Sequence, residues 1–322
     1  MDAQLTRTLA FGSDAIDEAA ALIAAGQCVA IPTETVYGLA ADATNGAAVT
    51  RVYEAKGRPS FNPLIVHVPD LAAAKKFAAF DKRAEMLAVA FWPGPLTLVL
   101  PVKPSGGIAS LVTAGLETIA IRVPRHRAMQ ALLAASGKPL AAPSANASGT
   151  ISPTRAAHVR ASLDGRIPLI VDDGPTEQGI ESTIVRQVFG TTRILRNGPV
   201  TADALRVALG GQAKIERFDP GEGNAKIESP GQLLSHYAPR KPLRIDAPRA
   251  APEEWMIGFG ATGGDDNLSA TGDLVEAATR LFDALHRGDL SGKPRIAVAP
   301  VPDEGIGEAI NDRLRRAAYT VR

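Results

Sequence analysis

The sequence predicts an α/β protein with two domains joined by a linker, and three observations support this prediction. The chain has 322 residues, more than one hydrophobic core usually serves, and its 45% hydrophobic content is enough for two cores. Strand and helix patterns alternate along most of the chain, as they do in α/β folds. Residues 210–240 are instead rich in Gly, Pro and charge and show little periodicity, which is typical of a linker. We therefore expect a first domain at 1–211, a linker at 212–240 and a second domain at 241–322.

Composition and charge exclude several classes of protein. The formal net charge is only +1, which argues against a protein whose main task is to coat nucleic acid or a membrane surface. Cys28 is the single cysteine, so neither a disulfide framework nor a cysteine zinc site can form, and we interpret it as a small buried hydrophobic residue. The N-terminus lacks the pattern of a signal peptide, and no apolar segment is long enough to span a bilayer. The sequence therefore predicts a cytoplasmic protein without stable membrane association.

The first elements lead to a polar segment. Ser13 is expected to cap a helix over 14–23, and a strand over 28–31 follows. Three polar side chains come after that strand at alternating positions: Thr33, Thr35 and Tyr37. In an extended chain they would share one face and could bind a ligand, as residues at strand ends do in α/β sheets. The alternative is an ST-turn that caps the next element.

Two short polar clusters each lie where an apolar run stops. Lys56 ends a helical pattern over 47–55, and Gly57 stops the helix, so Lys56 and Arg58 fall on a turn. The second cluster, Ser144-Ala145-Asn146, follows a run of small residues that indicates a buried strand. Two cations, a hydroxyl and an amide suit phosphate or carboxylate recognition. We therefore expect both clusters to converge on one cavity.

Strands predicted over 64–68 and 118–124 carry a histidine and an arginine. On sequence grounds alone, a lone histidine such as His67 in an apolar strand is more often a core residue than a site residue. Arg122 shares a face with Thr118 and Ala120 by the period of two, so it needs an anionic partner if that face is covered. The alternative is an exposed edge strand. Between these strands we expect helices over 71–77 and 82–91 and a strand over 96–100.

The remaining elements complete the two domains. Ser152 precedes a predicted helix and is a candidate phosphate contact. Arg196 ends a strand, and the helix over 202–209 is expected to close the first domain. Beyond the linker, further strands and helices alternate as in a small parallel α/β unit: strands over 243–245, 255–259 and 295–299, and helices over 273–287 and 304–318.

Six segments together resemble a known family: Thr33-Glu34-Thr35-Val36-Tyr37-Gly38-Leu39, Lys56-Gly57-Arg58-Pro59, Asn62-Pro63-Leu64, Trp92-Pro93-Gly94-Pro95, Pro143-Ser144-Ala145-Asn146 and Ser235-His236-Tyr237-Ala238-Pro239. In order and spacing they are similar to the threonylcarbamoyl-AMP synthases, the two-domain form of the YrdC-like family. The resemblance implies a twisted, mixed YrdC-like α/β sheet domain, a linker and a small Rossmann-like parallel α/β domain.

The same resemblance implies a reaction. L-Threonine, bicarbonate or CO2, and ATP would give L-threonylcarbamoyl-AMP and pyrophosphate, with Mg²⁺ accompanying ATP. The product would pass to the tRNA threonylcarbamoyl-transfer machinery, which forms threonylcarbamoyladenosine beside the anticodon.

The resemblance also implies roles for particular residues. The catalytic group comprises Lys56, Arg58, Ser144 and Asn146. The ATP side comprises Arg58, Asn62, Thr118, Ser144, Ser152, Arg196 and Tyr237. The threonine side comprises Thr35, His67, Arg122, Ala142 and Ser182, with Thr33, Tyr37 and His236 as additional candidates. The linker near His236 and Tyr237 would cover the pocket as a lid. Metal ligands stay open, because Asp172 and Asp173 could equally cap a turn.

Two other classes of function stay open on the sequence. One is an RNA-binding or regulatory module that uses the same basic pocket to bind a phosphate backbone, although the near-neutral charge argues against it. The other is a related enzyme that handles a carbamoyl-adenylate. Direct tRNA binding is likewise left open.

Overall fold

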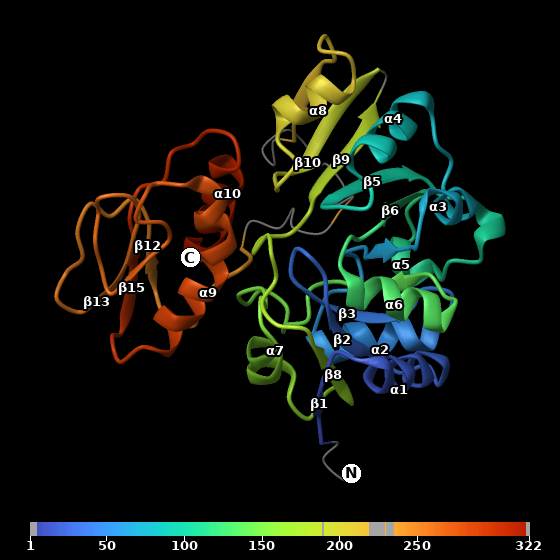
Figure 1. Ribbon diagram of the computed structural model, residues 1–322, viewed down its shortest axis with the longest axis horizontal. Coiled ribbons are helices and arrows are strands. Elements are labelled where there is room, and N and C mark those ends of the chain that lie inside the picture. Colours follow the sequence, from blue (N-terminus) through green and yellow to red (C-terminus); the bar gives the residue numbers. More distant parts are fainter. Residues whose placement is uncertain (1–4, 189, 219–228, 230–234, 320–322) are drawn as a thin grey trace.

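The computed structural model describes residues 5–188, 190–218, 229 and 235–319. The chain forms two α/β units, one built on an 11-stranded sheet and one on a 4-stranded sheet. In Figure 1 the second unit, in orange and red, lies beside the first and presents its two helices toward it. The two-unit α/β fold predicted from the sequence is therefore confirmed.

The large sheet is mixed, with the strand order β1-β8-β2-β3-β7-β4-β6-β5-β9-β10-β11. Its strands are β1 (Arg7–Ala10), β2 (Val29–Pro32), β3 (Tyr37–Asp42), β4 (Ile65–His67), β5 (Leu96–Pro101), β6 (Thr118–Arg122), β7 (Leu140–Ala141), β8 (Leu169–Asp172), β9 (Thr183–Val188), β10 (Thr191–Arg196) and β11 (Ile215–Arg217). Its helices are α1 (Ser13–Ala24), α2 (Gly46–Lys56), α3 (Leu71–Phe77), α4 (Lys82–Phe91), the short 3-10 turn η1 (Pro104–Gly106), α5 (Ser110–Thr113), α6 (Arg127–Ser136), α7 (Ala156–Leu163) and α8 (Ala202–Ala208).

The period of two divides strands β4, β6, β5, β9 and β10 between two faces. One face contributes Val66, Ile121 and Val185 to the main core, which also receives the apolar sides of α2, α4 and α8. The opposite face carries a smaller apolar cluster: Ile65, Val99, Ala120, Ile184 and Leu195. That second face also carries His67 and Arg122, since they lie two residues from Ile65 and Ala120. It is the face on which a ligand can approach the sheet.

The second unit is an all-parallel sheet with the order β12-β15-β13-β14. Its elements are β12 (Leu243–Arg244), β13 (Glu254–Gly258), β14 (Asp266–Asn267), α9 (Leu274–Leu290), β15 (Arg295–Val298) and α10 (Gly307–Ala318). Its core comes mainly from α9, α10 and these strands, and it also takes in Val36, Ile151 and Tyr237 from outside the unit. The two units therefore share a hydrophobic contact.

Several predicted boundaries are corrected. Ser13 is the first residue of α1 and not its cap. The cap position is Gly12, which has no side chain to make a capping bond, and the Ser13 hydroxyl donates to Asp14 instead. Helix α10 begins at Gly307, later than expected. Strand β11 lies within the predicted linker and pairs with β10, so the first sheet extends to Arg217. Most of the remaining linker, at 219–228 and 230–234, lies outside the described residues.

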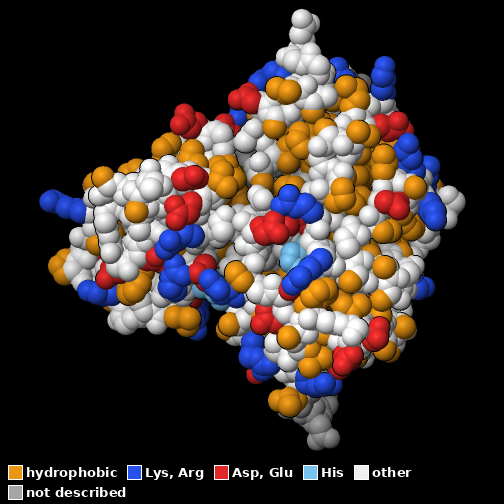
Figure 2. Space-filling model, viewed as in Figure 1, with side chains coloured by type: hydrophobic (Ala, Val, Ile, Leu, Met, Phe, Trp, Pro, Cys, Tyr) orange, Lys and Arg blue, Asp and Glu red, His pale blue; other side chains and the backbone are white. Residues whose placement is uncertain are grey.

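The surface carries no broad patch of one charge on the face in Figure 2, where Lys and Arg are interspersed with Asp and Glu. This agrees with the near-neutral net charge of the sequence. Among the described residues, no helix combines the length and apolar character needed to cross a bilayer. Cys28 is buried as expected, and burial raises the pKa of its thiol to about 11.

Candidate active site

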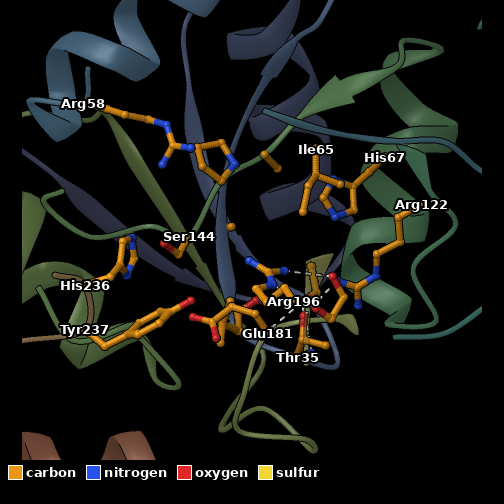
Figure 3. Close-up of a pocket in the computed structure, with 16 residues that line it drawn as sticks. Thr35, Arg58, Ile65, His67, Arg122, Ser144, Glu181, Arg196, His236 and Tyr237 are labelled. Atoms are coloured by element: carbon orange, nitrogen blue, oxygen red, sulfur yellow. Dashed lines mark hydrogen bonds between the residues drawn. The ribbon is translucent and has the colours of Figure 1, made fainter. Parts of the chain in front are cut away.

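A cavity lies where the second face of the large sheet meets the end of the linker. Its lining comprises Thr33, Thr35, Val36, Gly38, Arg58, Ile65, His67, Arg122, Ala142, Pro143, Ser144, Glu181, Ser182, Arg196, His236 and Tyr237. Figure 3 shows the labelled members surrounding a common space. Three arginines and one glutamate line it, so the cavity suits anionic ligands.

Arg58 and Ser144 line this same cavity, which confirms the predicted convergence of the two polar clusters. Helix α2 ends at Lys56, and Gly57 takes a left-handed conformation with φ 59°, which turns the chain away from the helix axis. Arg58 is then held by its own loop, since its Nε donates to the Asn62 carbonyl at 3.3 Å and its Nη2 to the Pro63 carbonyl at 3.1 Å. Burial lowers the pKa of Arg58 to about 10, so the guanidinium stays charged at neutral pH.

Lys56 and Asn146 lie behind the wall of the cavity and not in its lining, which corrects the expectation of direct contact with a ligand. The Lys56 ammonium donates to the carbonyl oxygens of Ser144 and Asn146, both at 2.5 Å. The Asn146 amide donates to the Thr150 carbonyl at 2.9 Å. Burial, with the nearby charge of Arg58, lowers the pKa of Lys56 well below its usual range. Both residues therefore fix the backbone that presents Ser144.

Thr33, Thr35 and Tyr37 do not share an extended face, so that expectation is wrong. The Thr33 hydroxyl accepts from the backbone N–H groups of Thr35 and Val36 at 3.1 and 3.2 Å, which makes the ST-turn named as the alternative. The turn still serves the site, because Thr33 and Thr35 line the cavity. Tyr37 points elsewhere, and its hydroxyl donates to the Gly174 carbonyl at 2.7 Å.

Arg122 lies on β6, an interior strand between β4 and β5, so the edge-strand alternative is excluded. Its expected anionic partner is supplied by the protein: Nη2 lies 2.7 Å from Glu34 Oε1, and both side chains are almost fully buried. Nη1 donates to the Thr35 hydroxyl at 2.9 Å and Nε to the Gly94 carbonyl at 3.1 Å. Burial alone would raise the pKa of Glu34, but the charge and hydrogen bonding of Arg122 hold it below its usual value.

His67 pairs in register with Arg122 on the neighbouring strand and faces the cavity. Burial, followed by the positive charge of Arg122, lowers the pKa of His67 to about 3. The imidazole is therefore neutral at physiological pH. Its Nδ1 is buried and has no hydrogen-bond partner among the described residues.

Ser182 and Arg196 form a third part of the lining. Arg196 Nε donates to the Ser182 carbonyl at 3.0 Å, and Nη2 donates to the Ser182 hydroxyl at 3.1 Å. That hydroxyl also lies 2.8 Å from the hydroxyl of Thr97. Burial lowers the pKa of Arg196. The strand end of β10 thus brings its arginine into the cavity, as the sequence indicated.

His236 and Tyr237 enter the cavity from the end of the linker, as expected. The backbone of Tyr237 has φ 64°, and the N–H of Ala238 donates to the Gly149 carbonyl at 2.8 Å. The Tyr237 ring packs against Phe282 of α9, with centroids 5.5 Å apart. Burial, followed by the charge of Arg58, lowers the pKa of His236 well below its usual value. This segment therefore connects the cavity to both units.

Two family models match the chain. One, described as "Telomere recombination" and covering Sua5, YciO and YrdC proteins, matches residues 21–198. The other, described as the C-terminal domain of threonylcarbamoyl-AMP synthase, matches residues 200–319. The chain belongs to the threonylcarbamoyl-AMP synthase family.

Relatives in the threonylcarbamoyl-AMP synthase family match along nearly the whole chain. The Bacillus subtilis enzyme is 41% identical over 338 residues, covering 98% of this chain and 96% of its own. The Pyrococcus abyssi enzyme is 39% identical over 318 residues and covers 93% of each chain. The crystal structure of P. abyssi Sua5 complexed with L-threonine has a TM-score of 0.88 and 35% identity, covering 97% of this chain and 98% of its own.

Three residues expected on the nucleotide side from the threonylcarbamoyl-AMP synthase motifs lie outside the cavity lining. Asn62 is buried, and its carbonyl accepts from Arg58, while its side-chain oxygen has no hydrogen-bond partner in the part of the chain that the structure describes. Thr118 lines a separate hollow with Val99 and Arg186. Ser152 lies before the start of α7, not at its N-terminus, and its hydroxyl donates to Glu181 Oε1 at 2.5 Å.

Sequence reasoning missed two carboxylates at the site, Glu34 and Glu181. Glu34 lies inside the Thr-rich segment, and Glu181 directly precedes Ser182, so both were adjacent to residues that were singled out. The described residues contain no group of three or more His, Cys, Asp or Glu that could hold a metal ion. Asp172 accepts from the backbone N–H of Gly174 at 3.0 Å, as a turn-capping residue does, and Asp173 pairs with Arg127.

Proposed function

We propose that this protein is an L-threonylcarbamoyladenylate synthase, which makes L-threonylcarbamoyl-AMP and pyrophosphate from L-threonine, bicarbonate or CO2, and ATP. The observation that carries the proposal is the convergence of Arg58, Arg122 and Arg196 on one cavity in a chain of this family. Such a cavity can hold a triphosphate and an amino-acid carboxylate side by side. We further propose that the product serves tRNA threonylcarbamoyladenosine formation in the cytoplasm, through a downstream transfer machinery.

The chemistry needs two bond-forming steps. The amine of threonine forms a bond to the carbon of CO2 and loses a proton, which gives a carbamate. A carbamate oxygen then attacks the α-phosphorus of ATP, and the bond to the pyrophosphate oxygen breaks. Neither step requires a covalent bond to the protein, so catalysis depends on positioning and on neutralising charge.

On the nucleotide side, Arg58 and Arg196 would neutralise the phosphates, and the Ser144 hydroxyl would donate to a phosphate oxygen. Both guanidinium groups are held by carbonyls of their own neighbourhood, so they lose little freedom when the nucleotide binds. Lys56 adds positive potential from behind Ser144 while it fixes the Ser144 backbone. These contacts would strengthen as charge moves to the leaving pyrophosphate.

On the threonine side, Thr35, His67, Arg122 and Ser182 would surround the substrate, and the small Ala142 leaves room beside it. Each guanidinium nitrogen of Arg122 already has a protein partner, so the carboxylate would use the N–H groups that remain. His67 is neutral at physiological pH, so it can accept a hydrogen bond from the substrate without adding charge.

Mg²⁺ is proposed to arrive with ATP. The one carboxylate in the cavity lining is Glu181, and both of its oxygens already have partners, so the described residues do not form a magnesium cage of their own. Magnesium keeps several waters and is commonly held by substrate phosphates. We therefore assign no step of the reaction to a protein-bound metal.

The end of the linker is proposed to act as a lid. His236 and Tyr237 line the cavity, and in a closed arrangement they would exclude water from the labile carbamate and mixed anhydride. A chain that ends before Ser229 should keep a folded first unit, measured by circular dichroism, and lose synthesis by about tenfold or more. Undiminished turnover by the shortened chain would reject the lid.

The deciding experiment measures pyrophosphate release from ATP with and without L-threonine. Release that requires threonine and bicarbonate, together with a product of the mass of threonylcarbamoyl-AMP, is the expected result. Release without threonine would favour an enzyme that handles another carbamoyl-adenylate. No release, combined with RNA binding that weakens steeply with salt, would favour the nucleic-acid module.

A further inference from the structure

One arginine of the second unit reaches the wall of the cavity. Arg313 lies on α10 and is fully buried, with an exposed fraction of 0%. Its Nε donates to Glu181 Oε2 at 3.1 Å, and its guanidinium carbon lies 5.4 Å from the centroid of the Tyr237 ring. Glu181 and Tyr237 both line the cavity. Arg313 therefore contacts two lining residues without lining the cavity itself.

Glu181 is a negative charge in a cavity built for anions. Its Oε1 accepts from the Ser152 hydroxyl at 2.5 Å, and its Oε2 accepts from Arg313. The serine provides a hydrogen bond but no charge, so Arg313 supplies the directly bonded countercharge. Without it, the carboxylate would repel an approaching triphosphate at low local dielectric.

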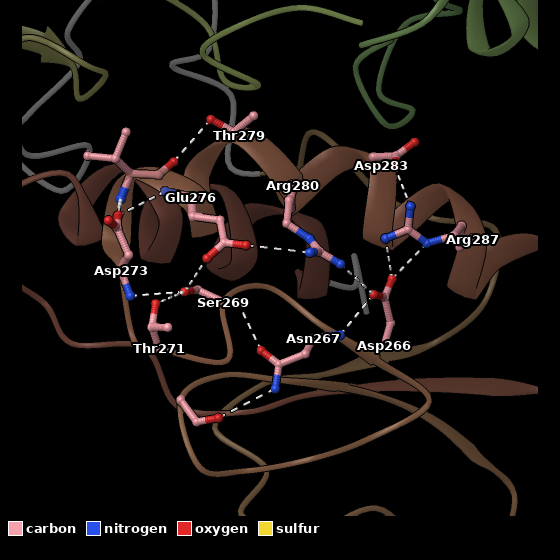
Figure 4. A network of polar contacts seen from close by, with 12 residues as sticks. Asp266, Asn267, Ser269, Thr271, Asp273, Glu276, Thr279, Arg280, Asp283 and Arg287 are labelled. Atoms are coloured by element: carbon pink, nitrogen blue, oxygen red, sulfur yellow. Dashed lines mark hydrogen bonds and ion pairs between the residues drawn. The ribbon is translucent and has the colours of Figure 1, made fainter.

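The loop that carries Glu181 is also fixed by the second unit. The Thr279 hydroxyl on α9 donates to the Glu177 carbonyl at 3.0 Å. Gly179 has φ +70°, and a Cβ there would lie 2.2 Å from the Thr279 carbonyl oxygen, so the loop can pass this close to α9 only with glycine. Helix α9 is itself attached to strand β14 by ion pairs (Figure 4). Asp266 of β14 accepts from Arg280 of α9 at 3.3 Å and from Arg287 of α9 at 2.8 Å.

We propose that Arg313 is a positioning residue of the nucleotide side, through which the second unit controls the affinity for ATP. It holds the Glu181 carboxylate and the Tyr237 ring in place, and it cancels the charge of Glu181. On the threonine side the buried ion pair lies within the first unit, since Glu34 and Arg122 both belong to it. The inference rests on the proposed function, because it takes ATP as the anion that binds.

The test compares full-length variants in ATP binding by calorimetry and in KM for both substrates. Arg313→Met should raise the Kd and KM for ATP by about tenfold or more, because Glu181 becomes an unpaired charge, and change KM for threonine by less than about twofold. The double variant Arg313→Met/Glu181→Gln should regain most of the ATP affinity. The matched control is Arg315→Met, which removes an exposed ion pair with Asp303 from the same helix.

Three further variants keep the test decisive if Arg313→Met folds poorly. Arg313→Lys retains the charge and should weaken ATP binding less than Arg313→Gln, and Glu181→Gln alone should tighten it. Equal losses for ATP and threonine, or no recovery in the double variant, would overturn the proposal. Calorimetry with ATP reports on Arg313 directly, whereas absent synthesis by the unchanged protein would count against the proposed function instead.

Discussion

Two buried ion pairs flank the cavity, and they differ in which parts of the chain they join. Glu34 and Arg122, 2.7 Å apart, connect a turn to a central strand of the same sheet. Glu181 and Arg313, 3.1 Å apart, connect a loop of the first unit to a helix of the second. The first pair forms when one sheet folds, whereas the second forms only when both units are docked. The ion pair on the threonine side is thus held within one unit, and the ion pair on the nucleotide side depends on two.

The two pairs also differ in where the contacts of the arginine lie. Each guanidinium nitrogen of Arg122 has a partner in the first unit, from Glu34, Thr35 or Gly94. Arg313 contacts one carboxylate and one ring across the boundary and otherwise pairs with its neighbour Asp312. Because its contacts with Glu181 and Tyr237 cross the boundary, the second pair is the more suitable place for a change of domain position to alter binding.

The largest effect is expected from Arg122→Met, which breaks the pair within the first unit. It leaves Glu34 charged and buried, so the free energy of unfolding should fall by about 3–5 kcal/mol. Urea denaturation measures this loss, and calorimetry should show threonine binding abolished. Glu34→Gln/Arg122→Met should recover part of the stability but none of the threonine affinity. If Arg122→Met were as stable as the unchanged protein, Glu34 would have to be solvated. The Glu34–Arg122 pair would then not be a buried, preorganised contact.

A smaller effect is expected from Arg58→Ala, which tests how much this first-unit residue contributes to the nucleotide side. Removing one preorganised charged group should cost about 2–4 kcal/mol of transition-state stabilisation, measured as kcat/KM for ATP. Lys56→Met is the informative companion, because it should act through the Ser144 backbone and lower stability as well as activity. If Arg58→Ala stays within about twofold of the unchanged protein, Arg58 takes no part in phosphate binding, which then rests on Arg196 and Ser144.

The sequence predicted the strongly periodic elements and the meeting of Arg58 with Ser144, because both follow from local patterns: α3 and α4 have the expected bounds. It could not predict the direction of Lys56, whose acceptors Ser144 and Asn146 lie 88 and 90 residues away. A cation beside a glycine turn is equally suited to a ligand phosphate and to backbone carbonyls.

The buried carboxylates show the same limit. Nothing in the local sequence indicates that Glu181 is neutralised by an arginine 132 residues further on in another unit. The sequence could not decide between an ST-turn and an extended face at Thr33 for a related reason. A threonine hydroxyl can accept from backbone N–H groups of a turn as readily as it can contact a ligand. Local chemistry therefore located the site, and only the tertiary structure separated the lining from its supports.

The smallest effect concerns His67, which lies beside Arg122 on the first-unit side. The pKa of His67 is about 3 in the folded protein against an ordinary value near 6.5, so below that value the unfolded chain binds a proton that the folded chain does not. The contribution of this pKa difference to the free energy of unfolding is complete above about pH 6.5 and is lost progressively toward pH 3. Between about pH 6.5 and pH 4.5 this amounts to roughly 2 kcal/mol, which His67→Gln should remove from the pH dependence of unfolding measured by urea titration. Comparing the change with pH in the two proteins cancels any packing cost of the substitution. Parallel pH profiles would show that His67 titrates normally, so the threonine side would be hydrated and not preorganised.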